Sequence, residues 1–274
     1  MSKEFDPIVA EWVAFSSDPK YNLVEKCLKL AQLLEYPKLD VQLYIDKINE
    51  IAKSLKILLS DVKNPTYLIS MLNEHLFTTL GFHADTDDYY DPKNNFLNEV
   101  LDKKSGIPIT LSIIYVEVAR RIGLDLRICG FPSHVVVKYS EEMILDPFGG
   151  GRLLDVEDLE EILYRNFGEE IEFSPEFLDE LPEDKVLIRI IRNLKNSYAQ
   201  SYAYQKALQC VNMILHSEPD SPDEIRDKGI LLDRLLNKKE ALGYLNKYLE
   251  IAPEAPDADF VLELIRDIRE KINQ

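Results

Sequence analysis

Apolar residues recur at helical spacing along much of the chain, and this pattern predicts a largely helical protein. In the segment 40–59 the apolar positions are Leu43, Ile45, Ile48, Ile51, Leu55 and Leu58. They lie close to the spacing of one helix face. Residues 22–34 repeat the pattern, with Asn22 placed to cap the helix. Residues 66–80 predict a further helix.

The middle of the chain carries a different pattern. The run 106–119 is apolar almost all round, and its polar exceptions are Thr110, Ser112 and Glu117. A helix without a polar face belongs inside a core. Pro108 suits the first turn of such a helix, because the missing N–H has no partner to lose there. Gly123 marks the end of the helix.

Short strands are predicted after this helix, over residues 126–131 and 134–139. Ile144 and Leu145 then lead directly into Asp146. The fold class predicted is therefore α+β, with a helical N-terminal part and a small antiparallel sheet packed on the buried helix.

The last part of the chain contains an internal repeat of 34 residues. The matching pairs are Ala207 with Ala241, Leu208 with Leu242, Leu215 with Leu249, and Pro219 with Pro253. This is the tetratricopeptide period, and two repeats are fewer than the roughly three that an independent solenoid needs. Residues 257–272 are expected to form a capping helix. The repeats are interpreted either as a helical tail that covers the core or as a concave surface for a peptide.

Composition narrows the function and the number of domains. The formal charge is −17, with 49 acidic against 32 basic residues. This balance argues against general nucleic-acid binding and against docking on anionic lipid. Residues 169–184, rich in charge and proline, are predicted to be a connecting arm. We expect an N-terminal helical region over 1–65, a core over 66–184 and a repeat domain over 185–274.

The cysteines and the chain start bear on location. Cys27, Cys129 and Cys210 are far apart and odd in number, so neither a disulfide framework nor zinc-ligand spacing is visible. The opening MSKEFDP lacks the apolar core of a signal peptide, and the longest apolar run is too short to span a bilayer. A cytoplasmic protein with no membrane segment, no cofactor and no bound metal is expected.

Several motifs of the central stretch carry a family resemblance. They are Tyr89-Tyr90-Asp91-Pro92, residues 94–101, Gly106-Ile107-Pro108-Ile109-Thr110-Leu111, residues 120–124, Gly130-Phe131-Pro132, His134, and Asp146-Pro147-Phe148. Together they resemble the bacterial SirB-type proteins, a transglutaminase-like family of papain-type fold with tetratricopeptide repeats behind the core. The resemblance implies a cysteine at the start of the buried helix, a histidine on the next strands and an aspartate on the strand after.

His134 and Asp146 fit the histidine and the acid of such a site, in which a thiolate at a helix N-terminus attacks and the histidine acts as base. In the family the cysteine usually lies fifteen residues before the glycine that closes the helix. Counted back from Gly123, that position is Pro108, which offers no nucleophile and no N–H for an oxyanion hole. We therefore predict no thiol chemistry at this position.

Two other residues are candidate nucleophiles. The Thr110 hydroxyl lies two residues further into the helix, although a capping or packing role is the favoured interpretation. Cys129 lies five residues before His134, on a strand, and is expected to be buried. Without a nucleophile, the His134 and Asp146 pair is consistent with a structural role, a ligand-binding role or general acid/base chemistry.

Two apparent ligand motifs fail on inspection. Asp85, Asp87 and Asp88 suggest a calcium loop, but the positions that need glycine and glutamate hold Tyr90 and Phe96. A solvated loop is favoured, with weak cation binding together with His83 as the alternative. The run Gly149-Gly150-Gly151 lacks the Walker pattern and is predicted to be a flexible turn.

The leading functional hypothesis is a degenerate transglutaminase-like protein that binds a protein or peptide partner. The alternative is a hydrolase or acyl transferase that uses Thr110, His134 and Asp146.

Overall fold

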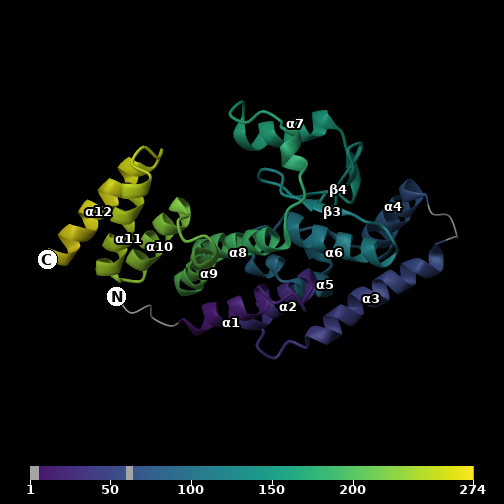
Figure 1. The fold of residues 1–274 in the computed structure, drawn as a ribbon, viewed down its shortest axis with the longest axis horizontal. Coiled ribbons are helices and arrows are strands. Elements are labelled where there is room, and N and C mark those ends of the chain that lie inside the picture. Colours follow the sequence, from purple (N-terminus) through teal and green to yellow (C-terminus); the bar gives the residue numbers. More distant parts are fainter. Residues whose placement is uncertain (1–5, 60–63, 274) are drawn as a thin grey trace. The chain divides into compact units, whose positions relative to one another are not determined.

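The computed structural model describes residues 6–59 and 64–273 (Figure 1). These residues form two compact units. One unit runs from Phe15 to Leu187, and the other combines the described residues after Leu187 with those before Phe15. The α+β class predicted from the sequence is confirmed. No helix among the described residues is long and apolar enough to cross a membrane.

The N-terminal helices begin where their capping residues predict. The first four helices are α1 (Pro7–Ser16), α2 (Leu23–Leu34), α3 (Val41–Leu58) and α4 (Pro65–Asn73). Asn22 and Glu25 form a reciprocal capping box at α2, as the sequence indicated for Asn22. Asp40 and Asn64 accept backbone hydrogen bonds at the starts of α3 and α4. These caps satisfy N–H groups that no helical partner can reach.

The helix predicted over residues 66–80 changes type part-way. After α4 the chain continues as a π-helix, η1 (Glu74–Thr79), in which Leu80 N donates to His75 O at 2.9 Å. A wider turn of this kind is rare and is frequent at functional sites. The spacing of apolar residues does not reveal it, because the two helix types differ by only one residue per hydrogen-bonded ring.

The buried helix is α6 (Pro108–Arg121), and Pro108 is its first residue as predicted. The elements that lead to it are β1 (His83–Ala84), η2 (Pro92–Asn95), α5 (Leu97–Lys103) and β2 (Ser105–Gly106). Strands β1 and β2 pair in parallel and bring the loop after Ala84 beside the start of α6. Gly123 has a φ of +92°, which suits a glycine after the last helical turn.

A four-stranded antiparallel sheet packs between α6 and α7 (Figure 1). Its strands are β3 (Arg127–Cys129), β4 (Val136–Ser140), β5 (Met143–Asp146) and β6 (Arg152–Leu154), in that order, and α7 covers Val156–Phe167. Val137 pairs with Leu145, and Asp146 pairs with Arg152. The predicted strands were too long. In particular, His134 lies in the turn that precedes β4, because the chain must first reverse after Phe131.

The segment 169–184 is not the plain connecting arm that its prolines and charges suggested. It contains the short helix η3 (Pro175–Leu178), and Leu178 is buried in a cluster with Cys129, Phe131 and residues of α7. Leu181 N donates to Ile128 O at 2.8 Å, and Glu180 forms a bridge with Cys129. The segment therefore covers the β3 edge of the sheet, which would otherwise leave backbone groups unpaired.

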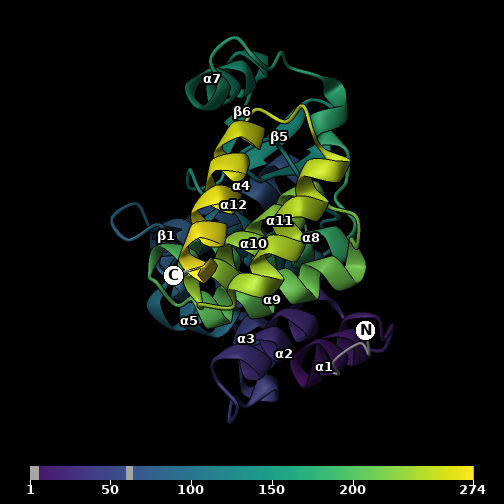
Figure 2. The ribbon, with the colours of Figure 1, turned by 90° about the vertical axis from the view of Figure 1, so that its left-hand side faces the viewer.

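The C-terminal helices form successive antiparallel pairs (Figure 2). They are α8 (Glu183–Gln200), α9 (Tyr204–Ser217), α10 (Pro222–Arg234), α11 (Lys238–Ile251) and α12 (Ala258–Asn273). Ala207 and Ala241 are completely buried, as the repeat register predicts. At Gly229 a Cβ atom would lie 2.7 Å from Leu245, so α10 and α11 approach closely there.

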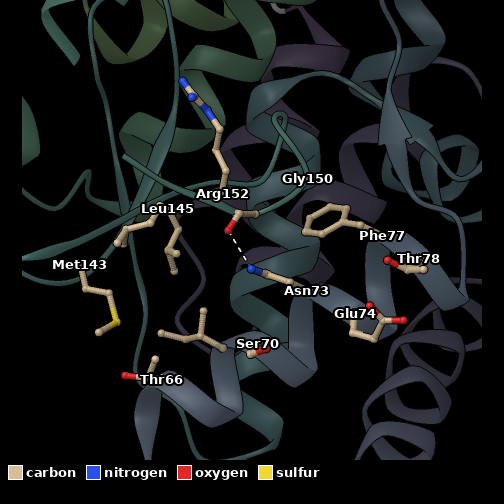
Figure 3. Close-up of a pocket in the computed structure, with 13 residues that line it drawn as sticks. Thr66, Ser70, Asn73, Glu74, Phe77, Thr78, Met143, Leu145, Gly150 and Arg152 are labelled. Atoms are coloured by element: carbon tan, nitrogen blue, oxygen red, sulfur yellow. Dashed lines mark hydrogen bonds between the residues drawn. The ribbon is translucent and has the colours of Figure 1, made fainter. Parts of the chain in front are cut away.

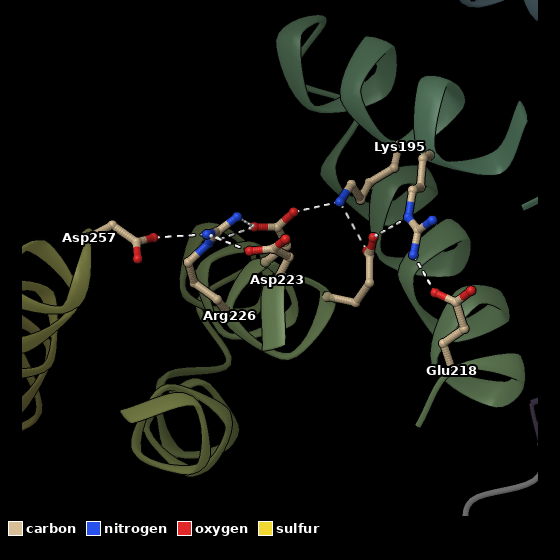
Figure 4. Close-up of polar contacts among 8 residues, drawn as sticks. Lys195, Glu218, Asp223, Arg226 and Asp257 are labelled. Atoms are coloured by element: carbon tan, nitrogen blue, oxygen red, sulfur yellow. Dashed lines mark hydrogen bonds and ion pairs between the residues drawn. The ribbon is translucent and has the colours of Figure 1, made fainter. Parts of the chain in front are cut away.

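An ion-pair network crosses α8, α10 and the residue before α12 (Figure 4). Glu224 is almost fully buried and receives hydrogen bonds from Arg192 and from Lys195. Lys195 also pairs with Asp227 at 2.6 Å. Arg226 then joins Asp227 to Asp257. Buried charges need partners of this kind, and the network supplies them for Glu224 and Lys195.

Candidate functional site

The predicted histidine and aspartate meet in the structure. His134 Nε2 lies 3.0 Å from Asp146 Oδ1. The two side chains are 13% and 9% exposed, so the pair is largely buried but reachable by solvent. Asp146 Oδ1 also accepts a 3.1 Å hydrogen bond from Phe148 N. The carboxylate is therefore held by the backbone of its own turn and can orient the imidazole.

A tight turn places His134. Ser133 has a φ of +56°, and His134 N donates to Phe131 O at 3.0 Å. A non-glycine residue in this region of φ is uncommon. The turn reverses the chain between β3 and β4, so that His134 reaches the end of β5, where Asp146 lies.

The glycines after Asp146 are required by close contacts as well as by the turn predicted there. At Gly149 a Cβ atom would lie 2.6 Å from Asp146 Oδ2. At Gly151, where φ is +78°, a Cβ atom would lie 2.2 Å from Asn73 Oδ1. A side chain at either position would displace a polar group of the site. Gly149 thus packs closely on the carboxylate and Gly151 on Asn73, whereas Gly150, with a φ of +75° and no atom within 4 Å of a Cβ, serves the turn.

Asn73 is a site residue that the sequence did not reveal. Its Nδ2 donates to Gly151 O at 2.7 Å, and its Oδ1 accepts from the buried Tyr115 hydroxyl at 2.6 Å. Gly151 N in turn donates to Asp146 O at 2.7 Å. Asn73 therefore ties α6 to the turn that carries Asp146. The only local signal is an asparagine at the end of an apolar helix, which is too common to single out.

Burial and ring packing hold this connection in place. Burial raises the pKa of Tyr115, so its hydroxyl stays protonated and donates. The Tyr115 ring stacks on Phe77 of the π-helix, with centroids 5.9 Å apart. The π-helix thus contributes a ring contact beside the Asn73 hydrogen bonds.

Asn73 also lines a pocket of about 430 Å³ (Figure 3). One wall is formed by α4 and η1, and the other by β5, β6 and the glycine turn between them. The lining includes Ser70, Glu74, Thr78, Met143, Leu145 and Arg152. The pocket therefore mixes hydroxyl, charged and apolar groups, and it lies against the turn that carries Asp146.

Thr110 lies at the helix start and binds backbone atoms. Its hydroxyl donates to Asn94 O at 2.9 Å and accepts from Ile107 N at 3.2 Å. The residue is completely buried. Within the described part of the chain, the hydrogen bonds of this hydroxyl all go to backbone atoms of Asn94 and Ile107. This geometry is that of a capping residue.

Aromatic rings from the loop after β1 and from the turn after Asp146 pack beside His134. Asp85 N donates to Gly106 O, so the loop after β1 begins beside α6. Tyr89 of this loop contacts the Phe148 ring at 6.1 Å, and Phe148 contacts His134 at 6.0 Å. Tyr89 and Phe148 of the family motifs thus form a series of ring contacts that ends at His134.

All three cysteines are buried in the protein. Cys129 is completely buried, and its Sγ donates to Leu178 O at 3.1 Å. Burial raises its pKa to about 11, so the thiolate is rare at neutral pH. Burial also raises the pKa of Cys27 in α2, as expected for a core residue. Cys210 is buried in α9.

The acidic loop after β1 is stabilised by a hydrogen bond between two of its own aspartates. Asp88 N donates to Asp85 Oδ1 at 3.0 Å, which is the turn geometry predicted for these aspartates. His83 Nδ1 lies 3.0 Å from Gly81 O. Among residues 6–59 and 64–273, no group of three or more His, Cys, Asp or Glu side chains is arranged to hold a metal ion.

Comparisons with known proteins agree with this architecture. The transglutaminase-like superfamily model matches residues 42–192, and a tetratricopeptide-repeat model matches residues 194–266. The UPF0162 protein of Xylella fastidiosa (strain 9a5c) is 34% identical over 233 residues, which cover 83% of this chain and 83% of that protein. The protein SirB1 of Salmonella typhimurium is 25% identical over 261 residues, which cover 93% of this chain and 97% of that protein. No solved structure matches this chain.

Proposed function

Because the chain belongs to the SirB-type (UPF0162) family of transglutaminase-like proteins, we propose that it works by binding a protein or peptide partner instead of by thiol catalysis. The family resemblance inferred from the sequence is confirmed, and so are the tetratricopeptide repeats. Repeats of this type commonly serve as binding surfaces.

Pro108 is the observation that carries the proposal. It is the first residue of α6, where the family's cysteine is expected. A proline there supplies neither a sulfur nucleophile nor an N–H donor for an oxyanion. The three cysteines of the chain are all buried, in α2, β3 and α9. Reduced, buried thiols also favour a cytoplasmic protein.

The alternative is a hydrolase or acyl transferase that uses the Thr110 hydroxyl with His134 and Asp146. The 3.0 Å contact between His134 and Asp146 and the partial exposure of His134 favour it. The hydrogen bonds of Thr110 weigh against it, because its hydroxyl proton is already directed to a backbone carbonyl. A nucleophile in this mechanism must instead donate to the base.

An affinity-capture experiment followed by calorimetry tests the proposal. The full-length chain and its His134→Ala variant are each used to capture partners, and Kd is then measured for a captured protein. Thr110→Ala should leave this Kd unchanged. The wild type and both variants are also assayed against a panel of amide and ester substrates. If the wild type turns over a substrate, and this turnover falls by roughly a hundredfold or more in Thr110→Ala and in His134→Ala, the proposal is contradicted.

A further inference from the structure

The pocket that Asn73 lines has one polar wall and one apolar wall (Figure 3). The polar wall is a row of side chains from α4 and η1, each four residues after the one before, so they follow one side of the helix. They are Thr66, Ser70, Glu74 and Thr78. The apolar wall is formed by Met143, Leu145 and Leu153 of β5 and β6. The volume of about 430 Å³ is that of a typical ligand pocket.

The polar row carries a charge that the protein does not match. Within the described part of the chain, none of its four side chains forms a hydrogen bond or an ion pair. The lining contains two charged residues, Glu74 and Arg152, and Arg152 is paired with Asp158 at 3.0 Å. In Figure 3 the guanidinium end of Arg152 points away from the row. The charge of Glu74 therefore favours a positively charged occupant.

The groups around Glu74 favour a cation that offers several N–H donors. Ser70 precedes Glu74 by four residues and Thr78 follows it by four, and both hydroxyl oxygens can accept hydrogen bonds. Lysine and arginine side chains end in several N–H donors and have no acceptor. Their aliphatic stems also suit an apolar wall. The pocket thus matches a basic side chain from its stem to its charged end.

Strand β6 presents a free edge beside this pocket. It is the last strand in the order β3-β4-β5-β6, and its backbone pairs with β5 alone among the described residues. Leu153 is 57% exposed, and the polar row is exposed along its length. A small ligand would be largely enclosed by its site. An open pocket beside a free edge instead suits an extended peptide, whose main chain pairs with the edge while alternate side chains enter pockets.

We propose that an extended segment of a partner protein adds as a strand at β6 and places a lysine or arginine side chain against Glu74. The inference rests on the proposed function and specifies the surface and the partner chemistry. Side chains of a strand alternate between its two faces, so a second side chain that enters the pocket lies two residues from the basic one. The apolar wall requires that second residue to be apolar.

The test uses Glu74→Gln, which removes the charge and keeps the size of the side chain. Glu160→Gln is the matched control, because Glu160 is an exposed glutamate of α7 that belongs to the same unit and does not line the pocket. Both positions are exposed, so both variants should keep the melting temperature of the wild type. A change in binding then reports the pocket and not the fold.

A displayed library of random peptides is the probe, selected on the full-length wild-type chain. We expect peptides with a lysine or arginine two residues from an apolar side chain. Their Kd should rise about tenfold in Glu74→Gln, as for the loss of a charge-assisted hydrogen bond, and stay unchanged in Glu160→Gln. It should also rise with salt concentration. Acidic peptides, no binding peptide, or an unchanged Kd in Glu74→Gln would overturn the inference.

The backbone of the selected peptide tests strand addition independently of charge. Alternate N–H groups of an added strand face β6, so N-methylation should raise Kd about tenfold at one set of alternate positions and leave it unchanged at the other. If neither set responds, strand addition is wrong. Equally tight binding of n-butylammonium chloride would then assign the pocket to a small cation.

Two further outcomes separate this inference from the proposed function. If the wild type is a dimer in light scattering and Glu74→Gln is a monomer, a second copy occupies the pocket and the basic partner is wrong. If partners captured by the wild type bind Glu74→Gln with the same Kd, the pocket is wrong while the proposed function stands. Turnover that depends on Thr110 and His134 would instead remove the proposed function.

Discussion

Asn73 donates a 2.7 Å hydrogen bond to the carbonyl of Gly151, although 78 residues separate them. The same side chain accepts the proton of the buried Tyr115 hydroxyl. Asn73 therefore holds a helix of the core and the turn after Asp146 in one arrangement. This amide is therefore one of the contacts that fix the turn after Asp146.

Replacing Asn73 with alanine should destabilise the protein. The change leaves the Tyr115 hydroxyl and the Gly151 carbonyl without their partner in a mostly buried place. A loss of about 1–3 kcal/mol in the free energy of unfolding is expected, measured by urea denaturation.

Tyr115→Phe provides the matched control, because it removes the hydroxyl and keeps the ring that stacks on Phe77. The double variant should lose less stability than the two single losses added together, since both remove the same hydrogen bond. Strict additivity would show that the contact between Asn73 and Tyr115 contributes nothing.

Introducing the family's cysteine tests the geometry at the helix start. In Pro108→Cys the new thiol should have a pKa below the ordinary 8.5 or so, because the helix N-terminus favours thiolate and because we expect His134 to face this end of the helix. Because Pro108 is buried, labelling by iodoacetamide at neutral pH should be slower than for an exposed thiol, and the quantity to measure is its excess over the wild type, whose three cysteines are also buried.

His134→Ala in the Pro108→Cys background is the control for this effect. It should slow labelling and raise the pKa of the introduced thiol. If the labelling rate and its pH dependence do not change, His134 does not face the start of α6. The chain then shares the fold of a thiol enzyme but not the arrangement of its active site.

Two glycines of the repeats should respond in opposite ways to alanine. At Gly229 a Cβ atom meets the buried Leu245 side chain at 2.7 Å, whereas at Gly243 nothing lies within 4 Å. Gly229→Ala should therefore lower stability by about 1–3 kcal/mol through overpacking. Gly243→Ala should raise it by about 0.5–1 kcal/mol, because alanine favours the helix. Thermal melts of both variants would decide, and a stabilised Gly229→Ala would contradict the close approach of α10 and α11.

His75 should make stability depend on pH. Burial lowers its pKa below the ordinary 6.5, so the unfolded chain takes up a proton that the folded chain resists. This contribution to stability is complete above about pH 6.5 and is lost as pH falls below that value. The urea midpoint of the wild type should drop between pH 7.5 and pH 5.5.

His75→Gln removes the titrating group and offers an amide to the Ser54 hydroxyl, which lies 2.9 Å from His75 Nε2 in the wild type. The drop in midpoint between the two pH values should shrink in this variant. An equal drop in both proteins would assign the pH dependence to other groups.

Local patterns in the sequence determined most of the elements. The all-apolar run after Gly106 predicted a buried helix, and α6 is that helix. Asn22 predicted a helix start because a cap acts on the N–H groups of the next three residues. The 34-residue register predicted the buried alanines of α9 and α11, since each repeat contacts only its neighbours. The pairing of His134 with Asp146 could also be predicted from the sequence, because only one hairpin separates the two residues.

Tertiary structure alone decided the rest. Asn73 meets Gly151, and Leu181 meets the β3 edge, across long stretches of chain whose local patterns say nothing about each other. The π-helix after Asn73 and the turn at Ser133 likewise accompany tertiary contacts, of Phe77 with Tyr115 and of His134 with Asp146. Hydrogen bonds of buried groups have to be satisfied wherever a partner lies. Partners distant in sequence are therefore fixed only when the chain has folded.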